Sequence, residues 1–204
     1  MVVREEAFPF AAPLAVAGAA LAVAGVPWPA AALGLASAAV CAFFRDPERT
    51  PPPDPGLLLS PADGRLLPLH REGGTVRLSV FMSVFNVHVN RFPCSGVVRE
   101  VRYNPGRFLA AWSDKASLDN EQVRILLDTE RGPLTVVQIA GLIARRVVCW
   151  ALPGRAFSRG ERLGLIRFGS RVDLYLPEEE VEVLAAPGDR VRAGVTPLAR
   201  WRPR

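Results

Sequence analysis

The chain opens with a long apolar stretch. Between Ala7 and Phe44 no position carries a charged side chain. Uncharged stretches longer than about 18 residues are typical of helices that span a membrane. This stretch is interrupted once, by Pro-Trp-Pro at residues 27–29, and proline ends or begins helices. We therefore predict that residues 1–44 form a membrane anchor made of a helical hairpin. One long tilted helix is the alternative.

Positive residues flank the apolar stretch at both ends, with Arg4 before it and Arg45 and Arg49 after it. Lysine and arginine beside membrane spans concentrate on the cytoplasmic side. A hairpin returns the chain to the side on which it entered. We therefore expect an anchor in the cell membrane with the rest of the chain on the cytoplasmic side. A single tilted helix would place the rest of the chain on the side opposite Arg4.

The pattern changes after the apolar stretch. Residues 45–56 are polar and rich in proline, which predicts a short stiff linker. Beyond the linker, short runs alternate apolar and polar positions between Gly and Pro turns, which predicts β-strands. One short helix is possible between residues 107 and 120. Residues 57–204 are thus expected to form one β-rich domain. Its predicted strands are 75–81, 97–103, 122–127, 134–139, 147–152, 163–168 and 172–176.

Two stretches near the ends of this domain resemble each other. They are residues 60–64 (Ser-Pro-Ala-Asp-Gly) and residues 186–194 (Ala-Pro-Gly-Asp-Arg-Val-Arg-Ala-Gly). Both are similar to turns of barrel-sandwich hybrids, the fold of lipoyl- and biotinyl-carrier domains. The predicted fold class is therefore mainly β, a barrel-sandwich-hybrid-like domain behind a membrane helical hairpin. Carrier domains present a lysine at such a turn and neither stretch has one, so this similarity concerns fold alone.

The domain is basic. The formal net charge is +5, and all but Arg4 of the 25 Lys and Arg residues follow residue 44. A basic surface beside a membrane anchor suits anionic lipid headgroups. Because no basic run is interleaved with aromatic residues, we expect no nucleic-acid partner.

The cysteines, Cys41, Cys94 and Cys149, lack metal-ligand spacing, so we expect them to be buried and reduced, and we expect no metal.

Few residues in the domain could carry acid–base or nucleophilic chemistry. The chain has two histidines, His70 and His88, and either could act as a general base. Gly169-Ser170 is the only Gly-Ser pair, and it lies between two predicted strands. On its own it predicts a turn. A glycine, however, leaves its carbonyl uncrowded, so the serine hydroxyl could attack it in an N→O acyl shift, given a base and oxyanion donors.

A series of short blocks adds a stronger signal, because the blocks occur in a fixed order. They are Ser60-Pro61-Ala62-Asp63-Gly64, Val87-His88-Val89-Asn90-Arg91, Tyr103-Asn104-Pro105-Gly106-Arg107-Phe108, Asp114-Lys115-Ala116-Ser117, Asn120-Glu121, Gln138-Ile139-Ala140-Gly141 and Arg167-Phe168-Gly169-Ser170-Arg171-Val172-Asp173. Together they resemble the short form of phosphatidylserine decarboxylases. The resemblance runs from the anchor to about residue 176 and more loosely to the end.

The resemblance implies that the protein makes its own cofactor. Family members cleave themselves at a Gly-Ser bond and convert the serine into an N-terminal pyruvoyl group. In this chain the bond is Gly169–Ser170, which would give chains 1–169 and 170–204 that stay together. An Asp, a His and the Ser act jointly in the family and correspond to Asp63, His88 and Ser170. His88 would take the hydroxyl proton and Asp63 would orient the imidazole, as in a serine triad.

The resemblance also implies the reaction, which converts phosphatidylserine in the membrane into phosphatidylethanolamine and CO2. The amino group of the serine headgroup condenses with the pyruvoyl ketone, and the imine accepts the electrons released with CO2. His88 is the candidate proton donor to the carbanion. Arg91 and Arg167 are candidates to hold the phosphate. A homodimer is plausible on the same resemblance.

The chain departs from the longer family members at two places. Phe85 stands where they carry a second histidine, and Phe168 precedes Gly-Ser where they have Leu-Gly-Ser-Thr. Any role of that histidine in decarboxylation must therefore fall to another residue. The second difference leaves the lipid backbone open, so archaetidylserine is an alternative substrate. A pyridoxal phosphate decarboxylase would need Lys115, the only lysine, for its resting Schiff base. A non-enzymatic membrane-tethered barrel-sandwich adaptor would explain the anchor but not the Gly-Ser pair with its histidine block.

Overall fold

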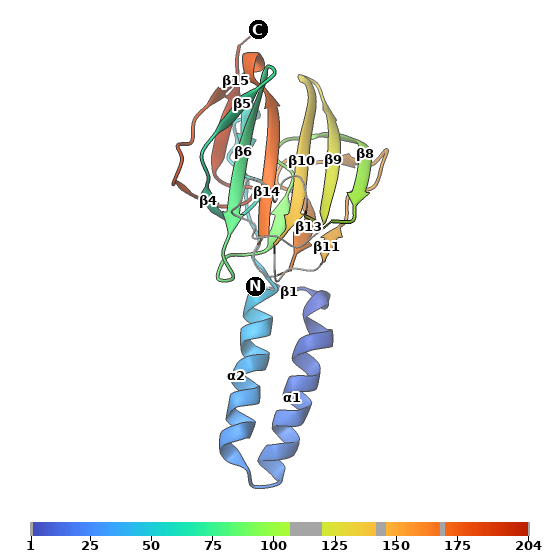
Figure 1. Ribbon diagram of the computed structural model, residues 1–204, viewed down its shortest axis with the longest axis vertical. Helices are drawn as coiled ribbons and strands as arrows, with labels where there is room; N and C mark the ends of the chain where they lie inside the picture. The colour runs from blue at the N-terminus through green and yellow to red at the C-terminus, as the bar shows by residue number, and fades with distance from the viewer. Residues whose placement is uncertain (1, 107–119, 142–145, 168–169, 204) are drawn as a thin grey trace. The chain divides into compact units, whose positions relative to one another are not determined.

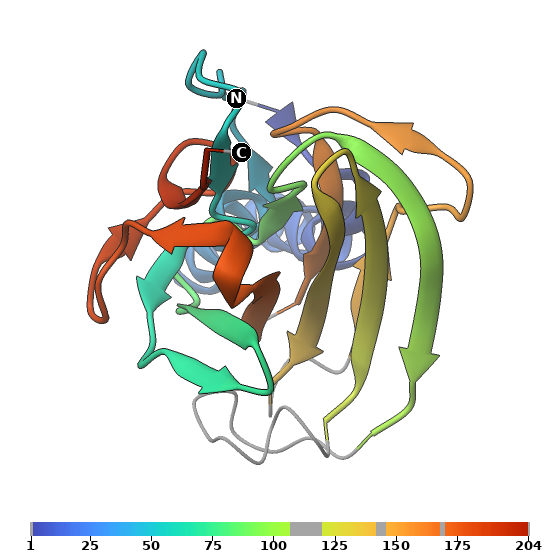
Figure 2. The same cartoon turned by 90° about the horizontal axis from the view of Figure 1, so that it is seen from above.

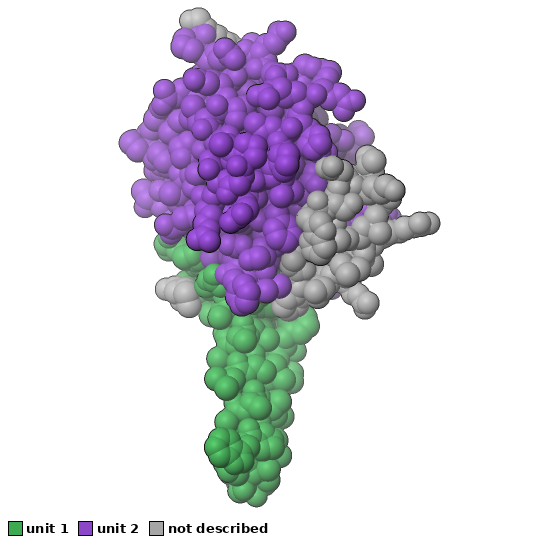
Figure 3. Space-filling view, turned by 60° about the vertical axis from the view of Figure 1, so that its left-hand side comes forward, with its two compact units in different colours: residues 1–48 green, residues 49–204 purple. Residues whose placement is uncertain are grey.

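The computed structural model describes residues 2–106, 120–141, 146–167 and 170–203 of the 204-residue chain. The chain divides into two compact units, Met1–Glu48 and Arg49–Arg204, which Figure 3 shows in different colours. The boundary falls inside the predicted linker. Its first residues therefore belong to the helical unit, and its later residues belong to the β domain.

The first unit contains two helices, α1 (Phe8–Val23) and α2 (Pro27–Phe43), which run antiparallel in Figure 1. A short 3-10 helix, η1 (Glu5–Ala7), precedes α1. The strands β1 (Val2–Val3) and β2 (Arg45–Asp46) pair antiparallel and bring the two ends of the unit together. Proline opens α2 because its fixed φ suits the first helical position, where an amide hydrogen would lack a partner anyway.

Small residues let the two helices approach closely. A Cβ on Gly18 would lie 3.2 Å from the carbonyl oxygen of Ala30, and the Ser37 hydroxyl donates to the Ala11 carbonyl across the helix pair at 2.9 Å. Among the described residues, one helical stretch, Glu5–Val23, is long and apolar enough to cross a membrane, and only 17% of its most apolar window is buried. Apolar side chains exposed on this scale indicate contact with something other than water.

Within the described residues of the second unit, the regular elements are β-strands and one 3-10 turn. They are β3 (Leu57–Leu59), β4 (Gly64–Leu66), β5 (His70–Glu72), β6 (Thr75–Met82), β7 (Val89–Arg91), β8 (Gly96–Asn104), β9 (Gln122–Thr129), β10 (Gly132–Ala140), β11 (Val147–Cys149), β12 (Ala156–Phe157), β13 (Arg162–Ile166), β14 (Ser170–Pro177), β15 (Val181–Val183), β16 (Arg190–Val191) and β17 (Pro197–Trp201), with one 3-10 turn, η2 (Glu178–Glu180).

The strands form three antiparallel sheets. The largest runs in the order β12-β8-β9-β10-β14-β6-β4-β16, with β5 beside β6, and the smaller sheets are β11-β13-β7 and β15-β17-β3. Figure 2 shows the long strands curving around the interior. The prediction of a mainly β domain is confirmed. The narrower barrel-sandwich-hybrid class stays a prediction, and the possible helix at 107–120 falls, except for Asn120, outside the described residues.

Strand β14 is central to the large sheet. It pairs with β6 along its whole length, from Ser170 to Pro177, and with β10 on its other side. On one of its faces Arg171 and Asp173 form a bidentate ion pair at 2.6 and 3.0 Å, and Arg171 also donates to Ser79 on β6 at 3.0 Å. Both charged side chains are at most 1% exposed. A buried ion pair of this kind costs several kcal/mol if one partner is lost.

The two similar stretches noted in the sequence lie side by side. Strand β16, from the later stretch, pairs antiparallel with β4, which begins at Gly64 of the earlier one. Gly64 lies so close to β6 that a Cβ there would be 2.0 Å from the carbonyl oxygen of Phe81. Only glycine allows this approach. The residue before it, Asp63, is thereby fixed near the end of β6.

The prediction that the three cysteines are buried and reduced holds only in part. All three are free thiols, but only Cys94 is buried, whereas Cys41 and Cys149 are partly exposed. Burial raises the pKa of the Cys94 thiol to about 12, against the opposing charge of Arg159. Burial also raises the pKa of Cys149. Both thiols are therefore protonated at neutral pH and poorly nucleophilic.

Candidate active site

Ser170 is the first residue of β14 and is fully buried. It pairs with Met82 on β6 and with Ala140 on β10. Its hydroxyl oxygen has no hydrogen-bond partner among the residues that the structure describes. Burying a hydroxyl without a partner costs about 1–3 kcal/mol, so such a group in a native core points to a function. The other half of the predicted cleavage site, Gly169, lies outside the described residues.

His88 comes just before β7 and is 2% exposed. Its backbone carbonyl accepts from the Ile166 amide at 3.4 Å, which ties it to the end of β13, shortly before Ser170. Its Nδ1 atom lies 3.0 Å from the carbonyl oxygen of Asn86. Because a carbonyl only accepts, Nδ1 donates in this contact, and in the neutral imidazole the lone pair is then on Nε2. This is the tautomer that a general base acting through Nε2 requires.

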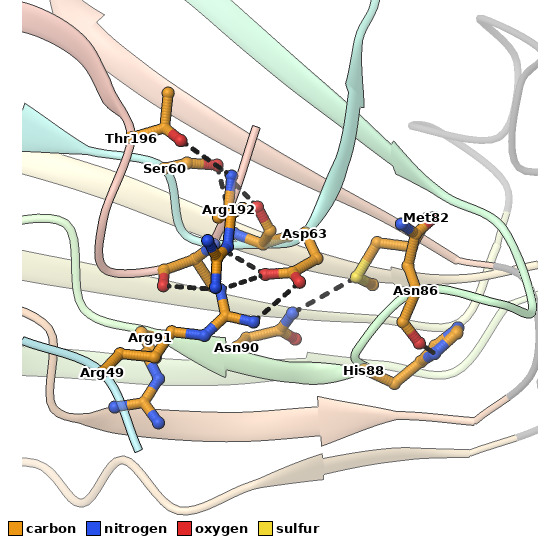
Figure 4. A network of polar contacts seen from close by, with 12 residues as sticks. Arg49, Ser60, Asp63, Met82, Asn86, His88, Asn90, Arg91, Arg192 and Thr196 are labelled. Atoms are coloured by element: carbon orange, nitrogen blue, oxygen red, sulfur yellow. Dashed lines mark hydrogen bonds and ion pairs between the residues drawn. The ribbon is translucent and has the colours of Figure 1, made fainter. Parts of the chain in front are cut away.

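Asp63 has other partners than the sequence led us to expect. Its two carboxylate oxygens accept from Arg49 at 2.6 and 2.8 Å, and the backbone N–H of Ala193 donates to Oδ1 at 2.7 Å. Figure 4 shows Asp63 directed toward Arg49, and the His88 ring directed toward Asn86. In this structure the backbone carbonyl of Asn86 therefore orients the Nδ1 atom of His88. The family resemblance assigns that contact to Asp63.

Asp63 and Ser170 nonetheless approach the same point of the sheet. Gly64 packs against β6 beside Met82, and Met82 is the register partner of Ser170. Since β6 lies between β4 and β14, the two backbones are two strand spacings, or roughly 10 Å, apart. Asp63 thus borders the site, on the opposite side of β6 from Ser170.

The two arginines proposed to hold phosphate are placed differently. Arg91 is 4% exposed, and its guanidinium donates to the carbonyl of Gly160 at 2.8 Å, which favours a structural role in joining β7 to the loop before β13. Arg167 is half-buried, directly after β13, and its backbone amide donates to the carbonyl of Arg146 at 3.3 Å. The Arg91 guanidinium thus has a protein partner, and both arginines remain predicted candidates for phosphate binding.

A separate groove of about 900 Å³ lies elsewhere on the domain. It is lined by Thr129, which ends β9 at the end of the sheet opposite Ser170, and by several arginines. Of these, Arg159 donates to the Asp54 carbonyl and Arg200 pairs with the Asp54 carboxylate. Two arginines of the groove thus bind Pro52 and Asp54, and the groove is distant from Ser170.

Comparison with known proteins identifies the chain as a carboxy-lyase, because residues 36–199 match the family model described as phosphatidylserine decarboxylase. Two relatives are named phosphatidylserine decarboxylase proenzyme. That of Desulfotalea psychrophila is 48% identical over 81% of each chain. That of Solidesulfovibrio magneticus is 54% identical over 78% of this chain and 77% of its own length. The chain belongs to the phosphatidylserine decarboxylase family.

Sequence reasoning missed residues that the structure brings to the site. Arg49 was counted only as a charge beside the anchor, although its side chain is 4% exposed and bound to Asp63. Asn90 and Gln138 each lie in a block that resembles the family, but no role followed from their positions. Their carboxamides are hydrogen-bonded to each other at 2.8 Å across two sheets. No short-range pattern could have shown these contacts, because each joins segments far apart in the chain.

The ion pair between Arg49 and Asp63 gives a first prediction. We expect Arg49→Met and Asp63→Asn to slow self-cleavage to a similar extent, because either change removes the guanidinium–carboxylate contact that fixes the residues before β4. A time course on denaturing gels measures this. Arg200→Met is the matched control, since it breaks an exposed arginine–carboxylate pair of the kind worth about 0–1 kcal/mol. Slow cleavage in Asp63→Asn alone would instead show that Asp63 acts on the reaction independently of Arg49.

Proposed function

We propose that this protein decarboxylates phosphatidylserine to phosphatidylethanolamine and CO2, with a pyruvoyl group that it forms from Ser170. One observation carries the proposal: Ser170 is fully buried at the start of a central strand, and its hydroxyl has no partner among the described residues. The name of the relatives, proenzyme, supports a chain that is made whole and then processed. A non-enzymatic adaptor is set aside, because the family consists of carboxy-lyases.

Self-cleavage begins with the chain's own serine as the nucleophile. His88 takes the hydroxyl proton at Nε2, and Ser170 Oγ attacks the carbonyl carbon of Gly169 while the peptide C–N bond breaks, so that an ester forms and the amine is released. Loss of the Cα proton of residue 170 then breaks the Cβ–Oγ bond. Residue 169 leaves as a carboxylate. One water molecule hydrolyses the remaining dehydroalanine to pyruvoyl and ammonia.

The pyruvoyl group supplies a ketone that condenses with the substrate amine and takes up the electrons released with CO2. The residues around Ser170 fit such a group, since Ser170 is fully buried and its neighbours on both sides, Met82 and Ala140, are apolar. His88 is proposed to donate the proton that completes the reaction, and Arg91 or Arg167 to hold the lipid phosphate. A pyridoxal enzyme would rely on Lys115, which lies outside the described residues.

The function is tested with purified full-length protein in detergent micelles that contain phosphatidylserine. We expect release of CO2 and formation of phosphatidylethanolamine, together with a small chain whose mass shows pyruvoyl in place of Ser170. An ether-linked archaetidylserine sample, run in parallel, tests the alternative lipid backbone. A chain that remains whole and inactive after prolonged incubation, or an adduct on Lys115 after borohydride reduction with substrate, would contradict the proposal.

We also propose that α1 and α2 cross the membrane as a hairpin, with the β domain on the cytoplasmic side and its basic surface on anionic headgroups. The support is the antiparallel helix pair, the largely exposed apolar side chains of the helices, and the positive residues at both ends of the pair. A homodimer, expected from the family resemblance, is checked by light scattering in detergent.

Removing the anchor gives a second prediction. Deletion of residues 1–44 should move the protein from the membrane pellet to the supernatant and leave self-cleavage intact, because the proposed reacting residues lie in the second unit. Activity on dispersed short-chain phosphatidylserine should survive better than activity on vesicles, since the anchor supplies local concentration and no chemistry. If the shortened protein still pelleted fully with vesicles, the basic surface alone would account for membrane binding, and the anchor would not be needed for it.

A further inference from the structure

The carboxamide of Asn90 lies above the central strand at the point where Ser170 begins it. Asn90 belongs to β7, in a different sheet from β14. Its Nδ2 atom donates to the sulfur of Met82 on β6 at 3.6 Å, and its Oδ1 accepts from Gln138 on β10 at 2.8 Å. Since β14 runs between β10 and β6, one small amide that touches both outer strands must lie across the middle one.

The register of the sheet shows which part of β14 lies beneath this amide. Met82 is directly opposite Ser170, and Gln138 is directly opposite Val172. Residues opposite each other in an antiparallel pair point to the same face. Ser170, Met82 and Gln138 therefore share the inner face of the large sheet, and the Asn90 amide covers the segment from Ser170 to Val172 on that face.

The arrangement depends on a glycine. Gly164 on β13 is the register partner of Asn90. A Cβ at this glycine would lie 2.9 Å from Nε2 of Gln138 and 2.3 Å from the carbonyl oxygen of Val148. The absence of a side chain at position 164 thus leaves the space in which the Gln138 amide reaches Asn90.

The two amides are poorly satisfied for such a buried place. Asn90 and Gln138 are both fully buried. The Gln138 carbonyl oxygen has no hydrogen-bond partner among the described residues, and the N–H of Asn90 points at a thioether, which is a weak acceptor. A buried polar group without a good hydrogen-bond partner lowers the stability of the fold. Two apolar residues would fill the same space at less cost, which suggests that the amides serve the chemistry at Ser170.

We propose that Asn90 is the hydrogen-bond donor that stabilises the departing oxygen of residue 170 during self-cleavage, with Gln138 as the residue that positions it. The inference rests on the proposed function. In the second step the Cα proton leaves, the Cα=Cβ double bond forms, and the Cβ–Oγ bond breaks. Negative charge then grows on Oγ, now part of the carboxylate of residue 169. An N–H placed over the side chain of residue 170 stabilises that charge.

The assignment makes a specific prediction about the ester, which forms before the proposed step. Asn90→Asp keeps the shape of the side chain and removes the N–H donors. Loss of one such donor typically slows a reaction about 100-fold or more. In this variant the ester should form and accumulate. Hydroxylamine, which cleaves esters, should then yield chain 1–169 ending in a hydroxamate and chain 170–204 beginning with an unmodified serine, both identified by mass.

A second variant protects the test against loss of folding. Asn90→Leu combined with Gln138→Leu removes both amides together, so neither is left without its partner and the melting temperature should not fall. It should accumulate the ester as well. Asn104→Asp is the matched control, because it makes the same chemical change at an exposed position on β8, and it should mature like wild type.

Three results would overturn the assignment. Processing of both variants at the wild-type rate would show that Asn90 plays no part. A folded variant that stays whole and does not react with hydroxylamine would show that Asn90 acts in the step that forms the ester. Ester accumulation in Asn104→Asp would show that the effect is not local to the site. A wild-type chain that never cleaves would instead refute the proposed function, which keeps the two failures distinct.

Discussion

Replacing Ser170 by alanine should leave the chain whole. Alanine has no hydroxyl, so the N→O acyl shift cannot begin and no pyruvoyl group can form. The expected result is a single chain on denaturing gels with the mass of the uncleaved protein. Decarboxylation should fall below detection, because the variant lacks both the nucleophile and the cofactor made from it. Intact-mass spectrometry after prolonged incubation, with a parallel lipid assay, measures both effects.

Two companion variants sharpen this result. Ser95→Ala makes the same change at an exposed serine and should be processed like wild type. Ser170→Cys keeps a nucleophile and should cleave, more slowly, through a thioester. Fragments that end at residue 169 in Ser170→Ala would mean that another group attacks the bond, and the assignment of the cofactor to this serine would fail.

Loss of the His88 imidazole should have the next largest effect. A positioned general base contributes about 10²–10⁴-fold to a reaction rate, so His88→Ala should slow maturation by about that factor. The other histidine is the control: His70 is exposed on β5, and His70→Ala should mature normally. Gel time courses at constant pH measure the rates, and circular dichroism shows that each variant is folded.

The outcome for His88 also bears on how its ring is held. The Asn86 carbonyl fixes Nδ1–H, and Asn86 is itself fixed by Ser83, whose amide and hydroxyl donate to its Oδ1 at 2.9 and 2.8 Å. Ser83→Ala should therefore slow maturation far less than His88→Ala, because one of these two bonds remains. Normal maturation of His88→Ala would move the role of base to another residue.

The sequence alone predicted the longer strands of the domain, but it missed most of the short ones and placed Ser170 in a turn, whereas Ser170 begins β14. Alternation of apolar and polar residues predicted β6 and β8 almost to their ends, and the predicted strands 122–127 and 134–139 became β9 and β10. Proline at 27 placed the start of α2. These features depend on neighbouring residues only. For the same reason, the serine and histidine blocks could be recognised without knowledge of the fold.

The long-range contacts could not be predicted in this way. The bond from Arg49 to Asp63, and from Asp63 on to Ala193, joins the start and the end of the domain. The placement of Asn90 over Ser170 depends on the register of three strands. A shift of one residue would turn each side chain to the opposite face, and no local pattern specifies such a register between distant segments.

The central position of β14 has a consequence for the life of the mature protein. After the proposed cleavage, the small chain still carries β14, β16 and β17, each hydrogen-bonded to a strand of the large chain. Native protein therefore stays in one piece. Once heated past unfolding, however, the two chains diffuse apart, and reassembly becomes a second-order encounter in place of an intramolecular one. Repeated calorimetric scans should recover the unfolding transition of unprocessed Ser170→Ala but not that of the mature enzyme. After maturation, the protein would therefore unfold irreversibly, because its two chains no longer refold together.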